Sequence, residues 1–79
     1  MYIEELKQEL AFVVVSNSLQ HLTPTLIMYD GYKKSLYIKF YNEWDHFLEN
    51  DKKEVLNILA TGLRARFGDG VKQVMEFEE

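Results

Sequence analysis

The chain has 79 residues, of which 47% are hydrophobic, 14% aromatic and 28% charged. This composition is typical of one globular domain, spanning residues 1–79, and excludes a disordered segment. It contains no cysteine, which excludes disulfides, thiolate metal sites and cysteine nucleophiles. The net charge of -4 argues against a general nucleic-acid binder, because binding to phosphates needs a basic surface.

No stretch of the chain has the pattern of a membrane span or a secretory signal. The longest apolar run, Leu10–Val15, is far too short to cross a bilayer. The first nine residues contain Glu4, Glu5 and Glu9, where a secretory signal would be basic. We therefore expect a soluble protein of the cytoplasm that does not bind membranes.

The first segment predicts one helix over roughly Ile3–His21. Its apolar positions form two adjacent stripes at helical spacing, one with Ile3, Leu6, Leu10 and Val13, the other with Phe12, Val15, Leu19 and Leu22. The run Phe12–Val15, with its three β-branched valines, would also suit a buried strand, so a short helix followed by a strand at Ala11–Ser16 is the alternative. In either case, the second half of the segment is expected to be buried, and Thr23-Pro24 ends it.

The stretch Thr25–Asn42 predicts a β-hairpin and is the centre of the fold. Two runs of strand-forming residues, Leu26–Tyr29 and Leu36–Tyr41, flank the turn signal Asp30-Gly31. The side chains expected on the core face are Leu26, Met28, Leu36, Ile38 and Phe40. That pairing requires a loop of three or five residues around Asp30–Lys34, or a bulge, with Gly31 at a positive φ.

Two further elements follow the hairpin. Asn42 is a candidate cap for a short helical turn, Glu43–Glu49, whose Trp44, Phe47 and Leu48 would anchor it to the core. Asp51 and Glu54 have capping-box spacing and would open a helix over Lys52–Phe67, which Gly68 would end.

Inside that second helix, Gly62 suggests a close approach to the sheet, because a helical glycine is otherwise unfavourable. The last strand is expected at Val71–Glu78, with Val71, Met75 and Phe77 on one face. The element order α-β-β-α-β predicts an α+β fold. We expect a two-layer sandwich in which two helices cover one face of a three-stranded antiparallel or mixed sheet.

Few residues have the spacing of a catalytic or metal site. His46 could share a helical face with Glu43, Glu49 and Asn50, but one histidine with two flexible carboxylates is more typical of a solvated turn. The glycines match no phosphate-binding loop, and no serine lies in a nucleophile-elbow pattern. The sequence therefore predicts a protein that is not an enzyme and that needs no metal or cofactor.

The second face of the hairpin is the candidate functional surface. Large aromatic side chains on an otherwise open sheet face need a cover, and tyrosine is enriched in protein–protein interfaces. The predicted binding residues are Ile27, Tyr29, Tyr32, Lys33, Lys34, Tyr37, Lys39 and Tyr41, with Val74 as a further candidate.

These residues favour a small protein-binding domain: an inhibitor, an immunity-type or antitoxin-type factor, a regulatory factor, or a homodimer. One alternative is a single-stranded nucleic-acid binder in which the tyrosines stack on bases and the lysines contact phosphates. Another is ordinary packing, with the first segment lying over the tyrosines.

Overall fold

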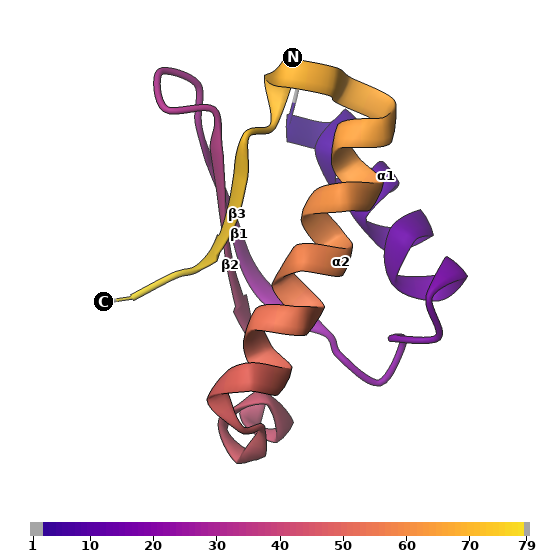
Figure 1. Ribbon diagram of the computed structural model, residues 1–79, viewed down its shortest axis with the longest axis vertical. Coiled ribbons are helices and arrows are strands. Elements are labelled where there is room, and N and C mark those ends of the chain that lie inside the picture. The colour runs from indigo at the N-terminus through magenta and orange to yellow at the C-terminus, as the bar shows by residue number, and fades with distance from the viewer. Residues whose placement is uncertain (1–2, 79) are drawn as a thin grey trace.

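The computed structural model describes residues 3–78, and residues 42 and 43 by their backbone only. Its elements, in chain order, are α1 (Ile3–Ser16), β1 (Pro24–Asp30), β2 (Ser35–Phe40), α2 (Glu49–Phe67) and β3 (Gln73–Glu76), with 3₁₀ turns at Asn42–His46 and Gly68–Gly70. Both helices lie on the same side of the sheet in Figure 1, and the other side of the sheet has no helix over it. The predicted α+β sandwich, with two helices on one face of three strands, is confirmed.

The sheet is mixed, with β2 in the centre. β1 pairs with β2 in the antiparallel direction and β3 pairs with β2 in the parallel direction. The parallel pair requires a long connection, which α2 supplies. On the helix side of β2, Leu36, Ile38 and Phe40 are buried as predicted.

The core lies between this side of the sheet and the two helices. The buried side chains from the helices are Leu6, Leu10, Val13, Val14, Val55, Leu59, Ala60 and Leu63. A Cβ atom on Gly62 would lie 2.7 Å from Cγ1 of Val13, so the glycine lets α2 approach α1 closely. The prediction that Gly62 approaches the sheet is wrong, because its neighbour is the other helix.

Helix α1 ends at Ser16, earlier than the predicted His21. The end is a Schellman motif: Ser18 has a φ of 59°, its N–H donates to the Val15 carbonyl at 3.1 Å, and the Leu19 N–H donates to the Val14 carbonyl at 2.8 Å. The alternative of a strand at Ala11–Ser16 is wrong, since these residues are helical. The prediction that this half is buried holds for Val14 but not for Phe12, which is 65% exposed.

The segment after β2 is anchored by aromatic packing. Trp44 is buried, with its ring centroid 4.7 Å from that of Phe40 and 5.5 Å from that of Phe47. Leu48, predicted to join them, is exposed. The 3₁₀ turn contains Asn42, and its N-cap is Tyr41.

Helix α2 starts earlier than predicted and ends as predicted. Its first residue is Glu49, and its N-cap, Leu48, makes no side-chain cap hydrogen bond, so the capping box at Asp51 is wrong. At the other end Gly68 has a φ of 58°, and its N–H donates to the Arg64 carbonyl. A positive φ at this position is why glycine ends the helix.

Both outer edges of the sheet are short or interrupted. Strand β1 begins with Pro24, and its pairing with β2 shifts between Pro24 and Leu26. Thr25 is therefore an extra residue, as in a β-bulge. The other edge, β3, has only four residues.

Candidate functional site

The hairpin loop decides which side chains reach the uncovered side of the sheet. Asp30 pairs with Ser35, so the loop has four residues, Gly31–Lys34. The Asp30 carboxylate accepts hydrogen bonds from the backbone N–H groups of Tyr32 (2.9 Å) and Lys33 (3.2 Å). The positive φ belongs to Lys34 (56°) and not to Gly31. The predicted loop of three or five residues is therefore wrong, and the bulge lies at the opposite end of β1.

An even-numbered loop inverts the predicted faces of β1. Ile27 pairs with Ile38 and Tyr29 with Leu36, so Ile27 and Tyr29 lie on the helix side and pack against the core. The Tyr29 hydroxyl donates a hydrogen bond to the Gly70 carbonyl. These two predicted binding residues are structural, and Leu26 and Met28, predicted as core, take their place on the uncovered side.

Strand β3 shows the same kind of inversion. Val74 pairs with Leu36 and is buried, while Met75 pairs with Tyr37. The Phe77 N–H donates to the Ile38 carbonyl at 2.9 Å, which extends the pairing and places Phe77 beside Lys39. Met75 and Phe77 therefore lie on the uncovered side, contrary to prediction, and Val74 does not.

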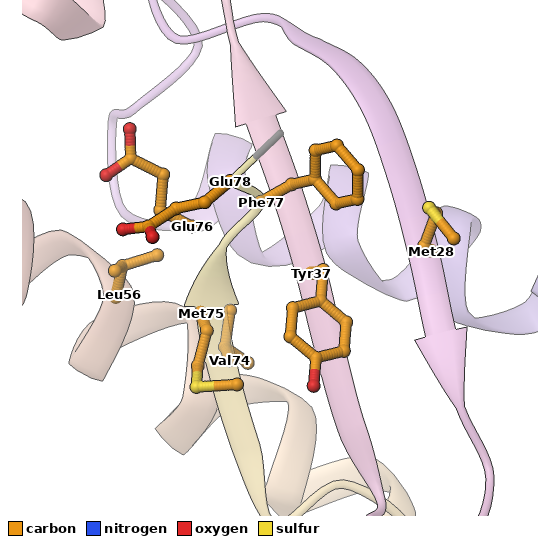
Figure 2. Close-up of a pocket in the computed structure, with 8 residues that line it drawn as sticks. All are labelled: Met28, Tyr37, Leu56, Val74, Met75, Glu76, Phe77 and Glu78. Carbon is orange, nitrogen blue, oxygen red and sulfur yellow. The ribbon is translucent and has the colours of Figure 1, made fainter.

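We use the name open sheet face for the nine residues that these registers bring together. They form three rungs across the strands: Asp30–Ser35–Gln73, Met28–Tyr37–Met75 and Leu26–Lys39–Phe77. Ser35 is only 2% exposed, so the rung nearest the hairpin presents the side chains of Asp30 and Gln73. Figure 2 shows Met28 on β1, Tyr37 on β2, Met75 on β3 and Phe77 on the chain just after β3. They line part of a hollow of about 540 Å³ that continues around the β3 edge to Leu56.

The open sheet face is apolar in the middle and polar toward the hairpin. Its middle rung is entirely apolar except for the hydroxyl of Tyr37, and Met28 is 47% exposed. Among residues 3–78 no helix or strand lies over this face (Figure 1). Tyr37 and Lys39 are the two predicted binding residues that lie within it.

The remaining predicted residues border this face. Tyr32, Lys33 and Lys34 are exposed at the hairpin tip, where Tyr32 is 101% exposed. Tyr41 is the first residue after β2 and is 56% exposed. The tip projects beyond the rest of the sheet (Figure 1).

The two ends of the open sheet face differ in charge. Lys33 and Lys34 are exposed at the hairpin end, where the backbone N–H of Lys72 donates to the Lys34 carbonyl at 2.7 Å. Glu78 lies at the opposite end and lines the hollow, as does Glu76, which pairs with Ile38 and therefore has its side chain on the helix side of β3. Beyond β3 the chain leaves the sheet on its uncovered side (Figure 1), so Glu78 is placed near whatever binds there.

The structure offers no competing metal site within its described side chains. Glu43 was a candidate metal ligand beside His46, and its side chain is not among those that the structure describes. Elsewhere in residues 3–78, no three histidine, aspartate or glutamate side chains are grouped so that they could hold a metal ion.

Neither helix within residues 3–78 combines the length and the apolar character needed to span a bilayer.

Comparison of the chain with protein-family models, curated proteins and solved structures finds no match.

Sequence reasoning missed Leu26, Met28, Met75 and Phe77 as surface residues. Both faces of β1 are apolar, so periodicity gave no basis for choosing one over the other. Strand β3 offered no such signal either, because its other alternating set, Lys72, Val74, Glu76 and Glu78, carries three charged side chains, whereas Gln73, Met75 and Phe77 carry none.

Proposed function

We propose that this protein is a small, non-enzymatic binding domain whose open sheet face docks against another protein. The observation that supports the proposal most is the middle rung, Met28–Tyr37–Met75, which is apolar and has no element of residues 3–78 over it. Apolar side chains in a contiguous patch on a small domain are typical of an interaction surface.

The residue types also support docking to a protein. Tyrosine, phenylalanine and methionine are enriched in protein–protein interfaces, and methionine side chains adapt to a partner's shape. Lys33 and Lys34, exposed at the hairpin tip, and Glu78, exposed beyond β3, supply polar side chains at the two ends of the face. A polar rim around an apolar centre is the usual anatomy of an interface.

The nucleic-acid alternative has less support than it had from the sequence. A stacking platform needs several aromatic side chains on one face together with cations. Tyr29 lies on the core side, which leaves Tyr37 and Phe77 as the aromatic side chains on the open sheet face. The acidic end of that face would also repel phosphates.

The proposal is tested by photo-crosslinking from the open sheet face. Met28 is replaced by a benzophenone amino acid and the protein is irradiated in the cells that produce it. We expect a covalent adduct with a protein, which mass spectrometry then identifies. The matched control places the same probe at Gln8, an exposed position on α1, on the covered side of the sheet.

An adduct that forms at Met28 and not at Gln8 supports a docking surface. Equal labelling at both positions, or no protein adduct at Met28, contradicts the proposal.

A further inference from the structure

We infer that a groove between α2 and β3 binds an acidic segment of the partner protein. The inference rests on the proposed function for the kind of ligand, a protein, and it specifies the chemistry of the part that binds beside the open sheet face. The groove has a volume of about 360 Å³, within the ~300–1,000 Å³ of ligand pockets. We use the name basic groove for it, because the charged side chains that line it are Lys53, Arg64 and Lys72.

One face of α2 forms the first wall of the basic groove. Its residues Lys53, Leu56, Ala60 and Arg64 line the groove, and their spacings of three and four residues place them on one side of the helix. The opposite wall is β3 with Lys72, the residue before it. The helix and the strand run in opposite directions (Figure 1), so Arg64 lies at the same end as Lys72 and Lys53 lies at the other end.

The charge of the basic groove is opposite to that of the chain. The sequence has 13 acidic residues against 9 lysines and arginines, yet no described carboxylate lines this groove. Glu76 has its side chain on the same side of β3, but it lines the neighbouring hollow instead. Within residues 3–78 the three cations form no ion pair with a described acid, whereas Lys7 pairs with Glu4 at 3.8 Å and Arg66 with Glu9 at 4.0 Å.

The sequence explains why the two cations on α2 lack partners. The residues three and four positions from Arg64 are not acidic: Ala60, Thr61, Phe67 and Gly68. Lys53 follows Glu49 by four residues, but the Glu49 carboxylate lies 4.0 Å from Nζ of Lys52. The helix dipole favours a cation at the end of α2, which accounts for Arg64 but not for Lys53 or Lys72. The groove therefore offers three cations to an anionic ligand.

The floor of the basic groove is apolar, which selects among anions. Ala60 and Val74 are buried, Leu56 and Met75 are half-buried, and none of the described lining residues is aromatic. Single-stranded nucleic acid needs aromatic side chains to stack its bases, and a small anion would leave the floor uncovered. A peptide with both acidic and aliphatic side chains complements the cations and the floor.

The basic groove is continuous with the surface already proposed for docking. Leu56, Val74 and Met75 line both this groove and the hollow beside the open sheet face. One partner can therefore cover the open sheet face and place an acidic segment around the edge of β3.

The spacing of the cations sets the length of the segment. Arg64 lies about 16 Å along α2 from Lys53, at ~1.5 Å per residue. An extended peptide rises about 3.3 Å per residue and its side chains alternate, so about five residues are needed. Acids at the first and fifth positions, with an aliphatic side chain at the third, would face the groove. These contacts use side chains and need no strand pairing with β3.

Selection from a phage-displayed library of random twelve-residue peptides on the purified chain tests the inference. We expect the enriched peptides to carry at least two acidic residues around an aliphatic one. Their dissociation constants are measured by fluorescence anisotropy. Arg64→Glu and Lys72→Glu should each weaken binding about fivefold, because an attractive pair becomes repulsive, and the double variant about twentyfold.

Two controls separate this effect from net charge. Lys7→Glu makes the same change of charge on α1, outside the basic groove, and should leave the dissociation constant nearly unchanged. A peptide with lysine in place of each acid should bind the double variant more tightly than it binds the parent chain. Circular dichroism confirms that each variant is folded.

Three results would overturn the inference. The first is a selection that enriches no acidic peptides, and the second is a loss of binding in Lys7→Glu as large as in Arg64→Glu. The third is a single-stranded DNA of twelve thymidines that binds more tightly than the peptides with the same dependence on Arg64 and Lys72, which would assign the groove to nucleic acid.

The outcomes distinguish this inference from the proposed function. A protein adduct at Met28 without enrichment of acidic peptides overturns this inference and leaves the proposed function standing. Acidic peptides that bind the basic groove without any adduct at Met28 overturn docking through the open sheet face and leave the groove as the binding site. The absence of both overturns both.

Discussion

Tyr29 shows how one residue can look functional in the sequence and be structural in the fold. Its ring packs on the core, and its hydroxyl donates to the Gly70 carbonyl, which lies between α2 and β3. The side chain therefore ties the hairpin to the segment that leads into the third strand. Tyr32, three residues later, has no such contact and is fully exposed.

The change Tyr29→Phe should lower the free energy of unfolding by about 1 kcal/mol, because it removes one hydrogen bond and leaves the Gly70 carbonyl without this partner. Urea denaturation measures the change. The matched control is Tyr32→Phe, which removes a hydroxyl from a solvated ring and should have no measurable effect. Equal effects for the two substitutions would show that the hydroxyl of Tyr29 contributes nothing to stability.

At the scale of elements, the sequence predicted all five helices and strands in the right order. The amphipathic pattern of α2, with Val55, Leu59 and Leu63 buried, is strong enough to identify the helix. Helix ends were less predictable, because α1 ends with Ser18 at a positive φ, where glycine is the usual signal.

The faces of the strands were predicted correctly for β2 and wrongly for both of its neighbours. For β1, the cause is Lys34, whose positive φ helps to close a four-residue loop, and lysine gives no sequence signal for that conformation. For β3, the cause is Val71, which is buried before the strand begins. The alternation counted from Val71 therefore placed Met75 on the wrong side. The candidate site was consequently correct at Tyr37 and Lys39 and wrong at Ile27 and Tyr29.

Replacing Ser18 by glycine should stabilise the protein. A residue other than glycine at this φ costs about 1–2 kcal/mol, while the extra freedom of glycine in the unfolded chain costs about 0.4–1 kcal/mol. The expected net gain is about 0.5–1 kcal/mol, measured by thermal or urea denaturation. Ser16→Gly, within the last turn of α1, should instead destabilise by a similar amount, so a loss at both positions would contradict the Schellman assignment.

At the scale of the whole molecule, the two sides of β2 have different roles. Ile38 is fully buried beneath the helices, whereas Tyr37, its neighbour in sequence, lies on the open sheet face. One side contributes mainly to folding, and we propose that the other contributes to binding.

This contrast predicts opposite effects for two substitutions in β2. Ile38→Ala should cost about 2–5 kcal/mol of stability, with little direct effect on association while the protein remains folded. Tyr37→Ser should cost about 1 kcal/mol and abolish association. Stability is measured by urea denaturation at low concentration, and association by the yield of the Met28 crosslink. If Tyr37→Ser destabilises as much as Ile38→Ala, Tyr37 belongs to the core and the open sheet face is not a binding surface.

The interrupted edges of the sheet limit how this protein can assemble. A proline and a bulge at the start of β1, together with the short β3, make poor templates for a strand added from a neighbouring molecule. Growth sideways into a filament is thereby disfavoured, because open-ended polymers of sheets need a continuous edge. Binding through the open sheet face, by contrast, does not use either edge and so adds no strand from which a further molecule could extend the sheet.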